Sequence, residues 1–159
     1  MNIFVLDRDP QKAAQYHCDK HVVKMILETA QILCAAFPKG DAPYKQTHYN
    51  HPCSIWARES LANFNWLIEL GYHLGEEYTA RYGKTHKSIA VIEWCDDHIP
   101  SLNFPQMEMT EFALAMPDYC KTSDAVESYR KYYIEEKKEI CSWKNGSPDW
   151  LKNYSYARD

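Results

Sequence analysis

The sequence predicts a mainly α-helical fold, a single-domain bundle of about five helices with a short N-terminal strand or extended arm. Apolar residues recur at the three- and four-residue spacing of a helix through most of the chain. Only 5 of the 159 residues are glycine, whereas 14% are aromatic, which is typical of a well-packed helical domain. A chain of this length builds one core and is too short for two.

Local signals give the order of the elements. Residues 3–6 are apolar and predict a short buried strand or an extended arm. Asp9-Pro10 is a typical helix start, with an N-cap aspartate and a proline in the first turn. Asp124 with Glu127 resembles a capping box, and Gly83 is placed to end a helix. The expected helices span about residues 10–37 (with a break near Asp19), 52–82, 88–95, 110–116 and 124–141.

The chain ends in an aromatic tail that starts at about residue 143. We expect it to dock on the bundle, because Trp143, Trp150, Tyr154 and Tyr156 are costly to leave in water. Residues 1–159 are therefore expected to form a single helical domain.

Composition excludes several classes of protein. Lys and Arg number 18 against 22 Asp and Glu, and the net charge of −4 disfavours a broad surface that grips the DNA backbone. A compact anion pocket remains compatible with that charge, because it needs only local positive potential. The six cysteines lie at least 16 residues apart, which disfavours a disulfide framework or an all-cysteine zinc cluster. They predict reduced thiols in a cytoplasmic protein, and the short apolar run at residues 3–6 predicts neither a signal peptide nor a membrane span.

The first long helix carries a narrow polar stripe within an arc of roughly 100°. Its members are His17, Lys20, His21, Lys24, Glu28 and Gln31. In one interpretation, Lys24 and Glu28 pair at i, i+4 and the stripe is simply a satisfied surface. In the other, the stripe is a pocket wall. Its Lys and His residues then hold an anion, and Glu28 acts as a base or accepts a hydroxyl hydrogen bond. Glu28 and Lys24 are the catalytic candidates.

Two further segments are candidates for the facing walls. The segment 44–52 leads into a helix N-terminus, a place where phosphate binds well, and offers Lys45, His48 and His51. His48 and His51 have the spacing of a metal pair, but no carboxylate or Cys lies nearby in a zinc pattern, so neither a metal nor another cofactor is expected. The second segment contributes Arg81, Lys84, His86 and Lys87, which also fit a helix C-terminal cap and a solvated turn.

Aromatic residues near these segments are candidates for stacking on a base. They are Tyr44, Tyr49 and Trp56. Trp56, together with Asn63, Asn65 and Trp66, equally fits core packing with some polar groups satisfied.

Part of this pattern resembles the pyrimidine-dimer DNA glycosylases of the endonuclease V type. The similarity covers about half of the chain. The residues that carry it are Ala13-Ala14-Gln15, His51-Pro52, Trp56, Asn63, Trp66-Leu67, Glu76-Glu77-Tyr78 and Arg81-Tyr82-Gly83. The whole sequence is also similar to a group of small proteins of large tailed phages. They begin with a similar Met-Asn-Ile-Phe and contain a similar Cys-Asp-Lys-His-Val-Val-Lys-Met. That second similarity is closer but carries no function with it.

The glycosylase resemblance implies cleavage of an N-glycosidic bond followed by β-elimination, with an N-terminal α-amine as nucleophile and a Glu on the first helix. By position, that Glu is Glu28 or, less directly, Asp19. The amine is not expected to carry over, because Asn2 is too bulky for ready removal of Met1 and residues 3–6 predict that the terminus leads into the core. Lys24 or Lys20 could replace it if burial lowered the pKa of that lysine.

Three hypotheses follow. In the first, the protein is a DNA glycosylase/AP-lyase-like enzyme that acts on damaged DNA or a nucleotide. In the second, it is a non-catalytic phage-type protein that sequesters a small nucleotide-derived signalling ligand, as an anti-defence sponge. In the third, it is an interaction protein whose polar stripe is satisfied internally. The first two rank nearly equal, and the sequence leaves the oligomeric state and the convergence of the three polar segments open.

Overall fold

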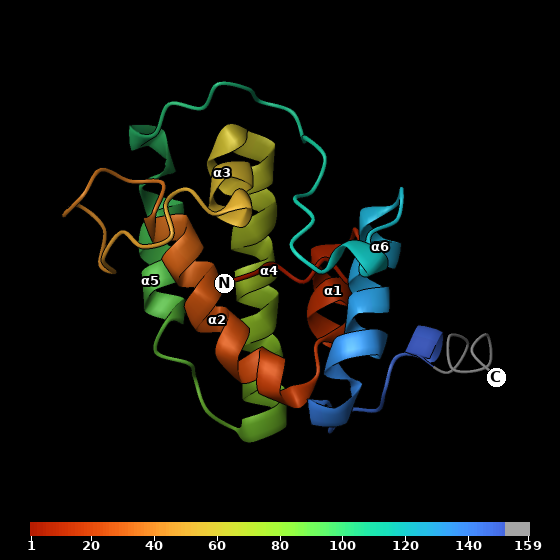
Figure 1. The fold of residues 1–159 in the computed structure, drawn as a ribbon. Helices are drawn as coiled ribbons and strands as arrows, with labels where there is room; N and C mark the ends of the chain where they lie inside the picture. The colour runs from red at the N-terminus through yellow and green to blue at the C-terminus, as the bar shows by residue number, and fades with distance from the viewer. Residues whose placement is uncertain (152–159) are drawn as a thin grey trace.

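The computed structural model describes residues 1–151, and Tyr154 and Tyr156 lie outside the described residues. The predicted mainly α fold is confirmed, and the described residues contain no strand. The α-helices are α1 (Pro10–Tyr16), α2 (Asp19–Cys34), α3 (Pro52–Glu59), α4 (Leu61–Tyr82), α5 (Ile89–Asp97) and α6 (Ala125–Tyr132) (Figure 1). A π-helical turn at Tyr133–Lys137 continues α6, and short 3₁₀ turns lie at Ile99–Ser101, Asp118–Cys120 and Lys138–Ile140.

Helix α4 is the centre of the fold, and α1, α2, α3 and α5 all pack against it (Figure 1). The absence of a side chain at Gly71 lets α2 and α5 come close to α4, because a Cβ there would lie 2.8 Å from Ile92 Cδ1 and 3.2 Å from Thr29 Cγ2. The predicted helix over 52–82 is divided at Ser60, whose backbone is extended and whose hydroxyl accepts from the Asn63 amide at 2.9 Å to cap α4. Gly83 ends α4 in the left-handed conformation, as predicted.

The predicted break near Asp19 is confirmed, since His17 and Cys18 are extended between α1 and α2. The prediction of a helix over 110–116 is wrong, because this stretch is an extended loop. Side chains supply its polar contacts: the Thr110 amide donates to Asn63 Oδ1 at 3.0 Å. Phe112 is buried against two tryptophan rings, so burial of one side chain outweighs the local helical pattern.

The N-terminal segment is an extended arm. Residues 3–6 are buried in the core, at most 4% exposed. Side chains bond part of this backbone: the Ile3 amide donates to Asn2 Oδ1 at 2.8 Å, and Arg130 Nε donates to the Leu6 carbonyl at 2.9 Å. The Leu6 amide donates to the Phe4 carbonyl at 3.0 Å. Of the two alternatives, strand or arm, the structure has the arm.

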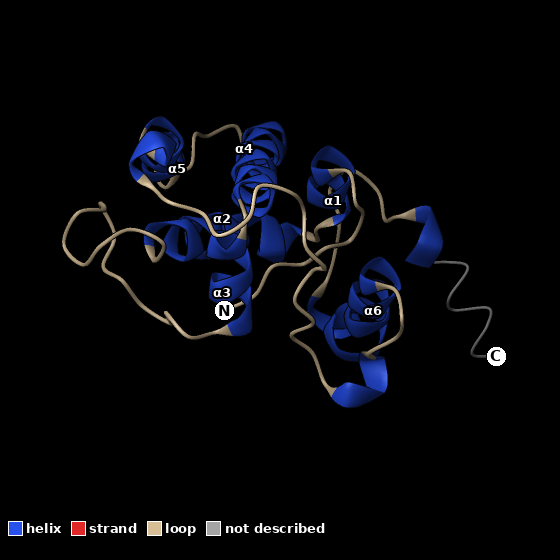
Figure 2. Ribbon diagram, turned by 90° about the horizontal axis from the view of Figure 1, so that it is seen from above, coloured by secondary structure: helices blue, strands red, loops and turns tan. Residues whose placement is uncertain are grey.

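The described part of the C-terminal tail packs beside α1 and α6. The Trp143 indole donates to the Tyr16 carbonyl at 2.8 Å, and the Trp150 ring lies 5.2 Å from the Arg130 guanidinium carbon. Figure 2, seen from above, shows α6 and this tail beside α1, on the side away from α5. None of the helices in residues 1–151 is both long and apolar enough to cross a membrane.

Candidate functional site

Helix α2 brings Glu28 to the start of the chain. Its Oε1 lies 3.0 Å from the Asn2 amide, which donates to it, and 3.4 Å from the Met1 amine. Its Oε2 lies 3.7 Å from Lys24 Nζ. The carboxylate is mostly buried, at 8% exposed for the residue, so its charge depends on these donors more than on water. One carboxylate therefore holds two amines and a backbone amide.

The two amines differ in their surroundings. The Met1 side chain is 4% exposed, whereas Lys24 is 70% exposed and forms the i, i+4 pair expected from the sequence. The prediction that the terminus leads into the core is confirmed, since residues 3–6 are buried. They enter the core beneath α2, which leaves the Met1 amine beside Glu28.

A cavity of about 130 Å³ opens at this carboxylate. Its wall opposite α2 comes from the end of α6, with Lys137 Nζ 5.1 Å from the centre of the Tyr132 ring. Its lining residues are Met1, Asn2, Phe4, His21, Lys24, Met25, Glu28, Tyr132 and Lys137. Three cationic groups, the Met1 amine and two lysines, thus line the cavity with one carboxylate, so its formal charge is positive although the chain is net negative.

The start of α3 lies against the same terminus. The Cys53 amide donates to His51 Nδ1 at 3.1 Å, and Cys53 Sγ lies 3.6 Å from Asn2 Oδ1. Burial lowers the pKa of His51, and the positive charges of the Met1 amine and of His48 lower it further. Burial also raises the pKa of the Cys53 thiol to about 11. The His51-Pro52 motif therefore positions a neutral imidazole near the Met1 amine.

A second cavity, of about 550 Å³, lies beside the exposed stripe of α2. His86 Nε2, 3.2 Å from the Val23 carbonyl, holds the turn after α4 against α2. The lining residues are Leu27, Gln31, Tyr44, Lys45, Gln46, Thr47 and Lys87. We call this cavity the basic groove. The three polar segments thus converge in part, since each contributes residues to it.

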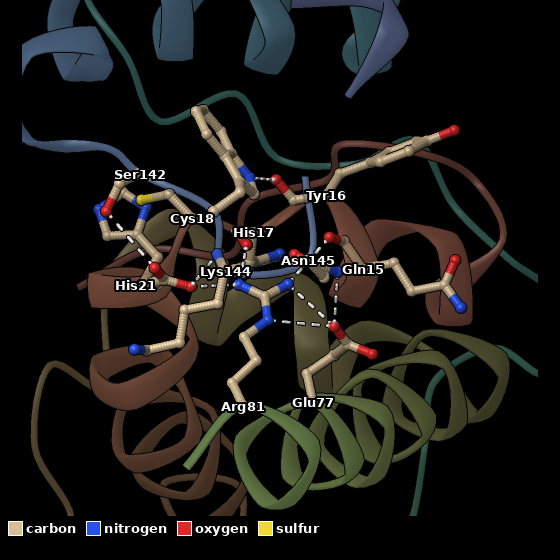
Figure 3. Close-up of polar contacts among 12 residues, drawn as sticks. Gln15, Tyr16, His17, Cys18, His21, Glu77, Arg81, Ser142, Lys144 and Asn145 are labelled. Atoms are coloured by element: carbon tan, nitrogen blue, oxygen red, sulfur yellow. Dashed lines mark hydrogen bonds and ion pairs between the residues drawn. The ribbon is translucent and has the colours of Figure 1, made fainter. Parts of the chain in front are cut away.

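Arg81 does not belong to either cavity, because the fold uses its guanidinium internally. The side chain is 2% exposed and lies between Asp19 Oδ1 at 3.1 Å and Glu77 Oε1 at 2.9 Å. It also donates to the His17 carbonyl at 2.8 Å and the Gln15 carbonyl at 3.0 Å (Figure 3). Every edge of the guanidinium is engaged, so none is left for a phosphate.

Two other candidates lie in the core. His17 is fully buried, with Nδ1 2.6 Å from the Ala13 carbonyl, and burial lowers its pKa to about 3. Its imidazole is therefore neutral and presents no surface to an anion. Trp56 is 3% exposed and stacks on Phe112 at 5.1 Å, so its ring offers no face to a base.

The remaining candidates are on the surface. Tyr49 is 44% exposed, but the Arg58 guanidinium carbon covers its ring at 3.7 Å. Lys20, His48 and Lys84 are exposed and line neither the Glu28 cavity nor the basic groove. Sequence reasoning missed Tyr132 and Lys137, which lie more than a hundred residues from Glu28 and carry no local signal for it.

The model of a family described as pyrimidine dimer DNA glycosylase matches residues 1–90. This range is more than half of the chain and contains the terminal amine, Glu28, Arg81 and all of α1 to α4. No curated protein and no solved structure matches the chain.

Proposed function

The chain belongs to the pyrimidine dimer DNA glycosylase family, and from this premise we propose that it cleaves the N-glycosidic bond of a damaged pyrimidine nucleotide in DNA, at the cavity around Glu28. One observation carries the proposal: the Glu28 carboxylate holds the Met1 amine at 3.4 Å in a mostly buried setting. An amine and a carboxylate in contact are the two groups that imine-forming glycosylase chemistry needs.

In the proposed reaction, the Met1 nitrogen attacks C1′ of the damaged nucleotide, a C1′–N bond forms and the bond from C1′ to the base breaks. The base leaves with the bonding electron pair and is protonated. Opening of the sugar ring gives an imine between the amine and C1′. Removal of a C2′ proton then expels the 3′ phosphate by β-elimination, and water releases the amine. Glu28 accepts the proton that the amine loses and passes it to the departing base. The regenerated carboxylate then stabilises the cationic imine and takes up the C2′ proton.

The geometry favours the Met1 amine over Lys24 as the nucleophile. The Met1 nitrogen lies 3.4 Å from Glu28 Oε1, whereas Lys24 Nζ lies 3.7 Å from Glu28 Oε2. The Met1 side chain is 4% exposed and anchors the chain start beside Glu28, whereas the Lys24 side chain is 70% exposed and reaches a surface where a phosphate could lie. If Met1 is removed, the new amine is on Asn2, whose nitrogen already lies 3.0 Å from Glu28 Oε1.

The net charge of −4 does not oppose this function, because the cations cluster where DNA would lie. Lys24 and Lys137 border the Glu28 cavity, and Lys45 and Lys87 line the basic groove beside it. Leu27, 39% exposed, adds an apolar surface to the basic groove. We propose that the four lysines contact phosphates on either side of the damaged nucleotide.

Borohydride trapping tests the proposal. The purified protein is incubated with duplex DNA that contains either a pyrimidine dimer or an abasic site, reduced, digested and analysed by peptide mass spectrometry. We expect a covalent adduct on the first residue of the mature chain, identified in the same experiment as Met1 or Asn2. An adduct on Lys24 would make the lysine the nucleophile, and no adduct with either DNA would refute the proposal.

Glu28→Gln is the matched variant. The amide keeps an oxygen to accept from the Asn2 amide but takes up no proton, so we expect the rate to fall about 10²- to 10⁴-fold. Glu76→Gln, on the exposed face of α4 with its side chain 63% exposed, is the control and should keep the full rate. Full activity of Glu28→Gln would exclude the proposed role.

The second candidate function is sequestration of a nucleotide-derived ligand without chemistry. The basic groove favours it, because its volume of about 550 Å³, a tyrosine and two lysines suit a base and its phosphates. Isothermal titration with mono-, di- and cyclic nucleotides tests it. Tight binding of an unchanged nucleotide would support it, and heat release at the level of buffer would exclude it.

A further inference from the structure

A second cluster of reactive side chains lies at the N-terminal end of α2, away from Glu28. Cys18 is the N-cap of α2, His21 is one turn later, and Cys141 directly follows the 3₁₀ turn Lys138–Ile140. The two sulfurs and a ring nitrogen of His21 all lie within 4.8 Å of one another. Figure 3 shows Cys18 and His21 side by side next to Ser142, the residue after Cys141.

This spacing is near that of a tetrahedral thiolate–imidazole site. Zinc bonds of about 2.3 Å to sulfur and about 2.0 Å to nitrogen place such ligand atoms about 3.5 to 3.8 Å apart. The cluster reaches that geometry by a contraction of about 1 Å, within the range of side-chain rotation. We propose that Cys18, His21 and Cys141 bind a thiophilic divalent cation, of which zinc is the biological representative.

The segment that carries Cys141 is held in place by contacts that do not need the ion. The Asp19 amide donates to the Ser142 carbonyl at 2.7 Å, and the Lys144 amide donates to Asp19 Oδ1 at 3.1 Å. The Cys18 and Cys141 sulfurs are therefore brought together by the fold itself. A pre-arranged site loses little conformational entropy when the ion binds.

Tyr133 supports the cluster from α6. Its hydroxyl lies 2.6 Å from His21 Nδ1 and 3.8 Å from Cys18 Sγ, toward which it donates. A donor at this place stabilises a metal-bound thiolate and orients the imidazole. A water molecule completes four-fold coordination.

The ion would also act on the proposed catalytic cavity. His21 lines that cavity and its ring stacks on Phe4 at 4.5 Å, so the same side chain borders the metal cluster and the Glu28 cavity. Binding would fix the end of α6, with Tyr132 and Lys137, against α2. The metal inference stands independently of the glycosylase proposal, because its readout is metal content.

The experiment measures metal binding by the full chain, which is purified in a non-thiol reductant and stripped with chelator. Separate samples of the metal-free protein are then titrated with Zn²⁺ and with Co²⁺. We expect one equivalent of tightly bound zinc, and for cobalt the thiolate charge-transfer and visible bands of a tetrahedral site. Cys141→Ser should weaken binding more than about 100-fold, the upper limit for the loss of a supporting contact. Cys141 is half-buried, so this substitution spares the core.

Cys34→Ser is the matched control. Cys34 and Cys95 form another buried thiol pair, with their sulfurs 3.7 Å apart, but belong to no such cluster with a histidine among the described residues. This variant should bind zinc like the parent. The absence of zinc binding by the reduced parent, or undiminished binding by Cys141→Ser, would overturn the proposal. A Cys18–Cys141 disulfide in the isolated protein that gives no zinc site after reduction would overturn it as well.

Discussion

Replacing Arg81 with methionine tests whether this residue belongs to the fold or to a DNA-binding surface. Its guanidinium joins α4 to the junction of α1 and α2 through the Asp19 carboxylate and two backbone carbonyls, and it pairs with Glu77 within α4 (Figure 3). The side chain is 2% exposed, and the Asp19 and Glu77 side chains are 12% and 17% exposed. Methionine has a similar stem but removes every donor, so both carboxylates lose their cation in a poorly solvated place.

The loss of stability depends on how many hydrogen-bond donors the two carboxylates keep when the guanidinium is removed. Removing one partner of a buried ion pair costs about 3–5 kcal/mol. Asp19 keeps the Lys144 amide and Glu77 keeps the Asn145 amide nitrogen at 3.2 Å, so we expect the lower end, about 3 kcal/mol in the free energy of unfolding. For a chain of this length that is a fall in melting temperature of about 6–12 °C.

Urea unfolding and scanning calorimetry measure the change. Arg8→Met is the matched control, because its pair with Asp124 is exposed, with 59% and 40% accessibility, and should contribute less than about 1 kcal/mol. Arg81→Met should keep the salt dependence of DNA binding. Unchanged stability together with a reduced salt dependence would refute the reasoning and restore Arg81 as a phosphate contact.

The remaining predictions concern pH and salt. Burial lowers the pKa of His17 from 6.5 to about 3, so between these values the unfolded chain binds a proton that the folded chain does not. His17 therefore contributes stability above pH 6.5 that is lost as the pH falls, by about 1.4 kcal/mol per pH unit inside that window. His17→Gln should flatten the stability–pH curve measured by urea unfolding between pH 6 and 4, and an unchanged slope would contradict the assignment. Lys45→Ala and Lys87→Ala should each weaken DNA binding and reduce the slope of log affinity against log salt by about 1 in fluorescence anisotropy. Lys12→Ala, an exposed lysine on α1, should leave that slope unchanged, and equal effects from all three would argue against the basic groove as the DNA contact.

Local signals predicted most of the helices. The Asp9-Pro10 start, the break before Asp19 and the Gly83 stop depend on neighbours within a few residues, which the sequence displays directly. The helix expected over 110–116 is absent because Phe112 is buried between tryptophans that the chain supplies from α3 and α4. A tertiary contact of this kind outweighs local propensity and leaves no mark on the local pattern.

In the candidate site, too, some residues were predictable from local sequence and others were not. Periodicity placed Glu28 and Lys24 on one stripe of a buried helix, and the structure has both at the Glu28 cavity. The same pattern treated Arg81 and His17 as surface groups, because a charge or an imidazole looks alike whether it faces water or a buried partner. Arg81 pairs with Asp19, 62 positions away, and local sequence patterns cannot predict a pairing between residues so far apart.

The sequence by itself therefore determined the helical class, most helix boundaries, the polar stripe with its carboxylate and the resemblance to a glycosylase family. Only the tertiary structure decided that the Met1 amine joins Lys24 at Glu28, which cations line the two cavities and which cysteines lie near His21. Helix caps and periodicity arise within a turn or two, so the chain encodes them locally. The Met1 amine reaches Glu28, and Cys141 reaches Cys18, only after a buried arm and a docked tail have packed across α2.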